Sequence, residues 1–192
     1  MSKMLILRGN SAPAGSYPDE QGNKIAWPIG ALHVWAASEY ARRKNFDPVV
    51  LDKPGQPQSQ HSPQATAALT MFLQDEAVTA FYGFSGGGYN MRHILDFLVS
   101  KHPETLSRID LVVVLGAPLQ PQSAYEKSTY NKLLKKGIPA AKWDLEYRTN
   151  PPRSALPKYV PKDTDTHMFG PEWLLSETPA GKSRDRPSVE AD

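Results

Sequence analysis

The sequence has no cysteine among its 192 residues. Structural disulfides, thiolate zinc sites and a cysteine nucleophile are therefore excluded. Long apolar runs are missing too: no stretch approaches the length of a membrane span, and the apolar core of residues 1–8 is too short for a signal peptide. We therefore expect a cytoplasmic protein without a membrane span, which folds without support from metals or disulfides.

A strong charge of either sign is also absent. Lys and Arg number 22 against 20 Asp and Glu, which leaves a formal net charge of +2. The basic residues form short clusters such as Arg42-Arg43-Lys44, and no basic stripe with interleaved aromatic residues runs along the chain. Short clusters are typical of solvated helix ends, so we expect no nucleic acid among the partners.

Apolar β-type runs alternate along the chain with segments of helical periodicity. The predicted strands cover residues 4–7, 48–52, 78–83, 109–115 and 142–148. The predicted helices cover residues 28–45, a segment capped by Ser62 and opened by Pro63, a segment from Ser85 to before Pro103, residues 123–136 and residues 171–176. Residues 8–28 are expected to form a polar loop up to the first helix. This order predicts an α/β fold: a doubly wound, mostly parallel sheet with helices on both faces, in three layers.

The length predicts one domain, over residues 1–176. Residues 177–192 are small, charged and nearly free of apolar side chains, which predicts a disordered tail. In doubly wound sheets, the binding site lies outside the carboxyl ends of the strands. The loops that follow residues 7, 52, 83 and 115 should therefore meet at one edge of the sheet.

The segment Gly83-Phe84-Ser85-Gly86-Gly87 fits the Gly-x-Ser-x-Gly nucleophile elbow, in which a strand turns sharply into a helix and exposes a serine. A serine in such a turn has an unfavourable backbone conformation, and a Cβ at either outer glycine would collide with a neighbouring strand or helix. Ser85 is therefore the candidate nucleophile. The alternative is that Ser85 only caps the following helix, which leaves the flanking glycines without a purpose.

The order of motifs resembles that of a minimal α/β-hydrolase over about residues 4–118. Residues 52–59 are similar to the Asp-x-Pro-Gly-x-Gly-x-Ser loop of that family, although Pro57 stands where the family has glycine. Residues 109–118 resemble its next strand with a Gly-Ala-Pro ending, and residues 8–10 lie where it places its oxyanion loop. The resemblance implies a serine hydrolase without a cap domain, with oxyanion donors from the backbone N–H groups of Gly86 and Asn10. Asn10 also fits an ordinary turn.

Five histidines compete for the role of general base. His93 lies about 12 Å along the helix from Ser85, at about 1.5 Å per residue, and His102 lies farther away. His33 falls on the apolar face of the first predicted helix, which favours a packing role. His61 remains a competitor, because its loop leaves the carboxyl end of a strand. His167 is preferred, because it follows the serine in the Ser, acid, His order of the family.

The acid that orients the histidine is less clear from the sequence. The place just past the strand that ends near Arg148 holds Thr149-Asn150, without a carboxylate. Asp163 and Asp165 are close enough in sequence to reach His167, and we select Asp165. Both aspartates also fit ordinary turns.

These residues predict a serine hydrolase that cleaves a carboxylic ester or related acyl bond through an acyl-enzyme on Ser85. Without a cap domain, the cleft should be open, which suits a small-molecule ester or an acyl group displayed on a larger molecule. Two alternatives remain: a catalytically impaired hydrolase-like binding protein, and a phosphate- or nucleotide-binding loop at residues 84–90, for which the Walker lysine is missing. We predict neither a cofactor nor a metal, because His93 and Asp96 form a helical pair without a third ligand.

Overall fold

The computed structural model describes residues 1–9, 15–18, 24–27, 29–51, 53–117, 143–148, 151–156 and 166–179. Within these ranges, the main sheet has five strands: β1 (Lys3–Leu7), β4 (Asp47–Val50), β5 (Val78–Phe84), β6 (Leu111–Leu115) and β7 (Trp143–Arg148). Their spatial order is β4-β1-β5-β6-β7, and each neighbouring pair is parallel. The predicted doubly wound parallel sheet is confirmed.

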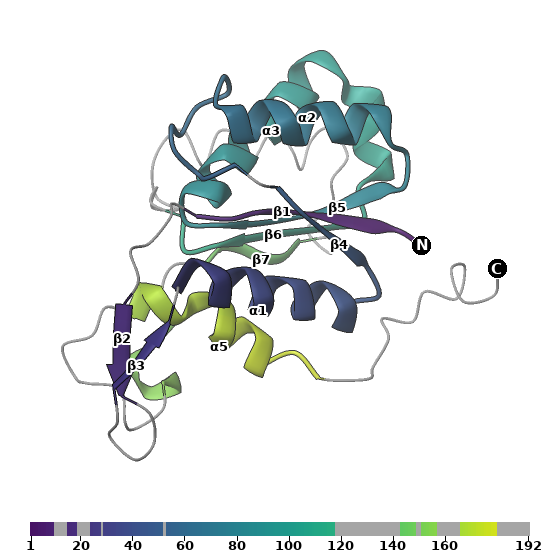
Figure 1. Ribbon diagram of the computed structural model, residues 1–192. Coiled ribbons are helices and arrows are strands. Elements are labelled where there is room, and N and C mark those ends of the chain that lie inside the picture. Colours follow the sequence, from purple (N-terminus) through teal and green to yellow (C-terminus); the bar gives the residue numbers. More distant parts are fainter. Residues whose placement is uncertain are drawn as a thin grey trace.

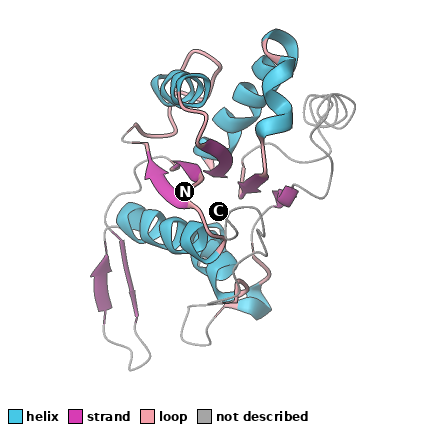
Figure 2. Cartoon of the chain, turned by 90° about the vertical axis from the view of Figure 1, so that its right-hand side faces the viewer, coloured by secondary structure: helices cyan, strands magenta, loops and turns pink. Residues whose placement is uncertain are grey.

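Helices cover both faces of this sheet (Figure 1). One face carries α2 (Pro63–Gln74), α3 (Gly86–Lys101) and the 3-10 helix η1 (Pro103–Arg108), and the other carries α1 (Ile29–Arg43) and α5 (Gly170–Ser176). Figure 2, turned by 90°, shows the strands between these two layers of helices. The three-layer arrangement is therefore the one that the order of elements predicts.

The central strands β5 and β6 are buried along their whole length. Ala80, Tyr82 and Phe84 of β5 pack in the core cluster on the side of α1 and α5, whereas Phe81 packs in the cluster on the side of α2 and α3. A parallel strand that is covered on both faces has no solvent-exposed face, which explains why β5 and β6 are nearly continuous apolar runs.

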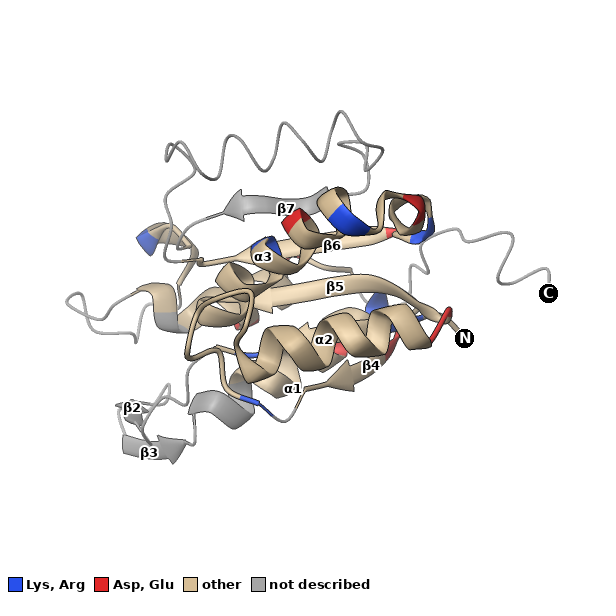
Figure 3. Ribbon diagram, turned by 90° about the horizontal axis from the view of Figure 1, so that it is seen from above, with Lys and Arg blue, Asp and Glu red and all other residues tan. Residues whose placement is uncertain are grey.

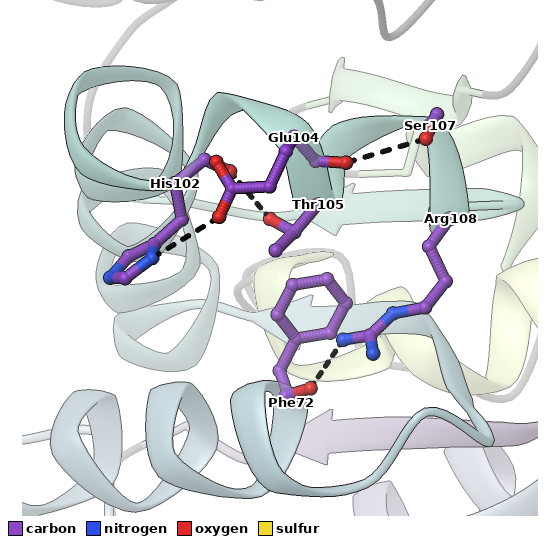
Figure 4. Close-up of polar contacts among 6 residues, drawn as sticks. All are labelled: Phe72, His102, Glu104, Thr105, Ser107 and Arg108. Atoms are coloured by element: carbon purple, nitrogen blue, oxygen red, sulfur yellow. Dashed lines mark hydrogen bonds and ion pairs between the residues drawn. The ribbon is translucent and has the colours of Figure 1, made fainter.

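The end of α2 is joined to η1 by Arg108 (Figure 4). The Arg108 guanidinium donates a hydrogen bond to the backbone carbonyl of Phe72 and lies 4.1 Å from the centroid of the Phe72 ring. At the other end of α2, Ser62 Oγ accepts a hydrogen bond from the Ala65 N–H at 2.9 Å, and Pro63 is the first helical residue. The predicted cap and start of this helix are confirmed.

The structure differs from the sequence prediction in two places. Residues 15–27, expected to be loop, contain an antiparallel hairpin of β2 (Gly15–Pro18) and β3 (Lys24–Trp27). Their sequences, Gly-Ser-Tyr-Pro and Lys-Ile-Ala-Trp, contain no continuous apolar run. The second difference lies between α3 and β6: the short helix η1 was not predicted, and the sheet strand predicted over 109–115 begins at Leu111. Pro28 and the predicted helix over 123–136 lie outside the described residues.

Within the described ranges, Figure 3 shows basic and acidic residues scattered over several elements, whereas α2 carries neither. None of the helices in those ranges combines the length and apolar character needed to cross a membrane. The absence of a nucleic-acid partner stays a prediction.

Candidate active site

Ser85 lies at the corner between β5 and α3, with φ 54° and ψ −120°. This is a left-handed conformation that costs a non-glycine residue about 1–3 kcal/mol. The Ser85 side chain makes no capping hydrogen bond to α3, while its backbone N–H donates to the Leu115 carbonyl at 2.9 Å and so continues the pairing of β5 with β6. The alternative that Ser85 serves as a helix cap is therefore wrong.

The glycines around Ser85 allow three elements to approach closely. A Cβ at Gly83 would lie 2.7 Å from Gly88 Cα, in the first turns of α3. A Cβ at Gly87 would lie 1.9 Å from the Leu7 carbonyl oxygen, at the end of β1. Both distances are far below van der Waals contact, so the predicted requirement for glycine at both positions is confirmed.

The structure brings His167 to Ser85 across 82 residues of sequence, with His167 Nε2 at 3.0 Å from Ser85 Oγ. His167 belongs to the 3-10 helix η4 (Thr166–Phe169), which leads directly into α5. Both side chains are partly exposed. The distance is within the range in which a general base can take a proton from a hydroxyl group.

The imidazole of His167 is held between an aromatic ring and a glycine. Phe84, the residue before the nucleophile, stacks on it with ring centroids 5.0 Å apart and an interplanar angle of 23°. Gly116 has φ +57°, and a Cβ there would lie 2.9 Å from His167 Cε1 and 3.0 Å from Nδ1. His33 packs edge-on against the same Phe84 ring, with the two ring centroids 4.7 Å apart. Sequence reasoning did not assign Phe84 or Gly116 to the site. For Gly116, the available sequence signal was its place directly after the strand that became β6.

The other histidines have different surroundings. His93 packs edge-on against Tyr89 in α3, and burial lowers its pKa. His61 is exposed, with Nε2 3.1 Å from Gln60 Nε2. His102 lies at the far end of α3 from Ser85, where its Nδ1 is 3.5 Å from Glu104 Oε1 (Figure 4). The preference for His167 over these histidines agrees with the geometry.

The loop after β1 reaches the nucleophile. A Cβ at Gly9 would lie 3.2 Å from Ser85 Cβ. The strands β1 and β5 flank the point where the order of the sheet reverses, which is the usual ligand-binding crevice of such sheets. Gly86 is the first residue of α3, so its N–H has no acceptor within the helix and is oriented toward the corner. Asn10, the second predicted oxyanion donor, lies outside the described residues.

The predicted acids Asp165 and Asp163, and the pair Thr149-Asn150, also lie outside the described residues. A half-buried carboxylate that sequence reasoning missed is Glu172, five residues after His167 in α5. Burial raises the pKa of Glu172 to about 7, and its Oε1 has no hydrogen-bond partner among the described residues. Burial, and then the charge of Glu172, raise the pKa of Tyr82 in β5. Acidic residues are common in the first turn of a helix, so nothing in the sequence distinguished Glu172 from an ordinary helix residue.

Comparisons of the chain with protein-family models, with curated proteins and with solved structures found no match. The resemblance to α/β-hydrolases therefore stays a prediction from the motifs. The functional argument rests on the geometry around Ser85.

Proposed function

We propose that this protein is a serine hydrolase that cleaves carboxylic esters or related acyl bonds through an acyl-enzyme on Ser85. The observation that carries the proposal is the 3.0 Å contact between Ser85 Oγ and His167 Nε2, made at a left-handed strand-to-helix corner. Backbone strain of this kind is retained where the surrounding structure requires a particular side-chain direction. Here it directs the hydroxyl away from the helix and toward the imidazole.

The reaction proceeds in two acyl transfers. Ser85 Oγ attacks the substrate carbonyl while His167 Nε2 takes its proton, and a tetrahedral oxyanion forms. The Gly86 N–H, supported by the start of α3, stabilises the oxyanion, with the Asn10 N–H as the proposed second donor. Collapse of the intermediate releases the alcohol, which receives the proton from His167. Water then attacks the acyl-enzyme by the same steps and releases the carboxylic acid.

The orientation of the imidazole has two proposed sources. The Phe84 ring fixes the plane of His167 by stacking, and Gly116 leaves room for its Nδ1 edge. Asp165 is the proposed partner of that Nδ1, in the role of the orienting acid.

The partly exposed Ser85 supports an open site, suited to a small ester or to an acyl group displayed on a larger molecule. A cysteine-free chain in which no described helix could span a membrane supports the cytoplasm as its place of action.

Labelling with an alkyl fluorophosphonate followed by peptide mapping tests the proposal. We expect the wild type to be labelled at Ser85, Ser85→Ala to take no label, and His167→Gln to be labelled at least about 100-fold more slowly, as removal of a general base implies. Label that persists in Ser85→Ala, or a wild type that takes none, would contradict the proposal. A labelled wild type that hydrolyses no member of a broad ester panel would favour the impaired binding protein.

A further inference from the structure

Two buried side-chain amides join the elements on either side of the elbow. Gln64 lies in the first turn of α2, and Asn90 lies in α3, five residues after Ser85. Both side chains are fully buried, at 0% exposure. Asn90 Nδ2 donates a hydrogen bond to Gln64 Oε1 at 2.9 Å, which links the two helices directly.

The remaining N–H groups of these amides bind backbone carbonyls. Gln64 Nε2 donates to the carbonyls of Arg8 at 2.8 Å and Lys53 at 3.0 Å, and Asn90 Nδ2 donates to that of Gly55 at 2.8 Å. All four N–H donors of the two amides are therefore satisfied. Turning either amide over would place N–H groups against N–H groups and oxygens against carbonyls, so the network has one orientation. A fully satisfied buried network of this kind is rigid.

The segment that this network holds is the corner Arg8-Gly9 at the end of β1. Gln64 binds the Arg8 carbonyl, and the Gly55 N–H donates to the Gly9 carbonyl at 3.2 Å. Ser85 and the start of α3 lie against the same corner, as the close approaches at Gly9 and Gly87 show. The corner is therefore held by contacts from α2, from α3 and from the loop that contains Gly55.

The link between the two amides joins the helix that follows Ser85 to the corner that lies against Ser85. Gly86 is carried by α3, the helix of Asn90, and Gly9, which approaches Ser85, is part of the corner that Gln64 binds. The position of this corner relative to Ser85 and Gly86 thus depends on the Asn90–Gln64 hydrogen bond. Oxyanion stabilisation needs donors within tenths of an ångström of the right place, and a misplacement of about 1 Å can cost about 100-fold in rate.

We propose that Gln64 and Asn90 are positioning residues of the hydrolase, whose amides hold the Arg8-Gly9 corner in place beside Ser85 and the proposed oxyanion donor Gly86. The inference rests on the proposed function, because a protein without acyl transfer has no oxyanion to bind. A purely structural role for the network would change stability alone, whereas a positioning role changes the rate of the fully folded protein.

The test compares Gln64→Met with Leu69→Ala. Methionine keeps the unbranched shape of glutamine without its donors. Leu69 lies on the same helix, packs against the core and is not part of the amide network, so we expect its truncation to lower stability alone. Labelling of Ser85 by an alkyl fluorophosphonate is followed over a range of reagent concentrations, at a temperature where circular dichroism shows every variant folded. This separates the maximal labelling rate from the half-saturating concentration.

For Gln64→Met we expect a maximal rate lowered at least about tenfold, with a half-saturating concentration within about twofold of wild type. For Leu69→Ala both quantities should stay within about twofold. Should Gln64→Met not fold, Asn90→Ser removes the link between the helices in a smaller change and should lower the maximal rate in the same way. A folded Gln64→Met or Asn90→Ser labelled at the wild-type maximal rate overturns the positioning role and leaves the hydrolase intact. A wild type that takes no label overturns both.

Discussion

At the scale of single residues, the half-buried carboxylate of Glu172 links the protein's stability to pH. Burial raises its pKa from 4.5 to about 7. The folded state therefore binds the carboxyl proton of Glu172 more tightly than the unfolded state does. The protonated Glu172 contributes fully to stability below about pH 4.5, and this contribution is lost as the pH rises through 7. Glutamine has the same shape but does not ionise, so the stability of Glu172→Gln does not fall in this way as the pH rises.

We expect the free energy of unfolding of Glu172→Gln to exceed that of wild type by at most about 3 kcal/mol at pH 8, at about 1.4 kcal/mol per pKa unit. The difference should shrink toward zero at pH 4. Urea unfolding at the two pH values measures it, with Glu177→Gln as the control, an exposed glutamate at the end of the same helix. A difference that is the same at both pH values would show that the ionisation of Glu172 is not the cause.

Residues that belong to a short sequence motif were predictable from the sequence. Gly83 and Gly87 are the outer glycines of the elbow pattern, and the collisions of their Cβ positions with α3 and with the end of β1 confirm the predicted reason. Phe84 was not assigned a role, because its contact with His167 joins two segments that are far apart in the chain. A sequence shows that Phe84 is apolar and buried, but not which ring lies on it.

At the scale of elements, the docking of α5 on α1 depends on Arg43. Its Nη1 donates to the carbonyls of Leu175 and Thr178, each at 3.0 Å, so an arginine at the end of one helix caps the end of the other. Arg43→Ala leaves these carbonyls without that donor. We expect a loss of about 1–3 kcal/mol in the free energy of unfolding, which is typical for hydrogen bonds with a charged donor.

The neighbouring Arg42→Ala is the matched control for Arg43→Ala. Arg42 is exposed and pairs with Glu39 three residues earlier, with 2.6 Å between Nη1 and Oε1. Such surface pairs contribute little, so a loss within about 0.5 kcal/mol is expected from urea unfolding. Hydrogen exchange should locate the Arg43→Ala effect in the amides of α5. Equal losses in the two variants would argue against the capping role.

The elements that the sequence predicted well are those with a strong local signal. Strands β5 and β6 are long apolar runs, and α2 begins at a serine followed by proline. The hairpin of β2 and β3 was missed because two four-residue strands, one ending in Pro18, resemble a loop. The helix η4 that carries His167 was expected as loop for a related reason: a single 3-10 turn has no periodicity to detect.

At the scale of the whole molecule, the strand order explains where the site lies. The alternation of elements predicts the layers, and the layers predict that the loops after β1 and β5 meet at the carboxyl edge. The approach of Gly9 to Ser85 agrees with this. The arrival of His167 at the same place depends on how α5 packs against α1 and the sheet, which no local pattern in the sequence specifies. His167 was predicted from the Ser, acid, His order of the α/β-hydrolases, the family that the chain resembles.

The same packing determines where the folded domain ends. The sequence predicts a disordered tail from residue 177, yet Thr178 is buried, and its Oγ1 donates to the Leu174 carbonyl at 2.8 Å while its own carbonyl accepts from Arg43. Thr178 therefore packs at the end of α5 and is not part of an extended tail.

Two truncations distinguish these boundaries. Removal of residues 180–192 takes away mostly small and charged residues, and should change the free energy of unfolding by less than about 0.5 kcal/mol. Removal of residues 177–192 also takes away Thr178 and one of the two carbonyls that Arg43 caps, and should cost about 1–3 kcal/mol. Urea unfolding of the two shortened chains beside the full chain measures both values. If the two shortened chains are equally stable, the domain ends at residue 176; if the shorter one is less stable, Arg43 and Thr178 close the fold together.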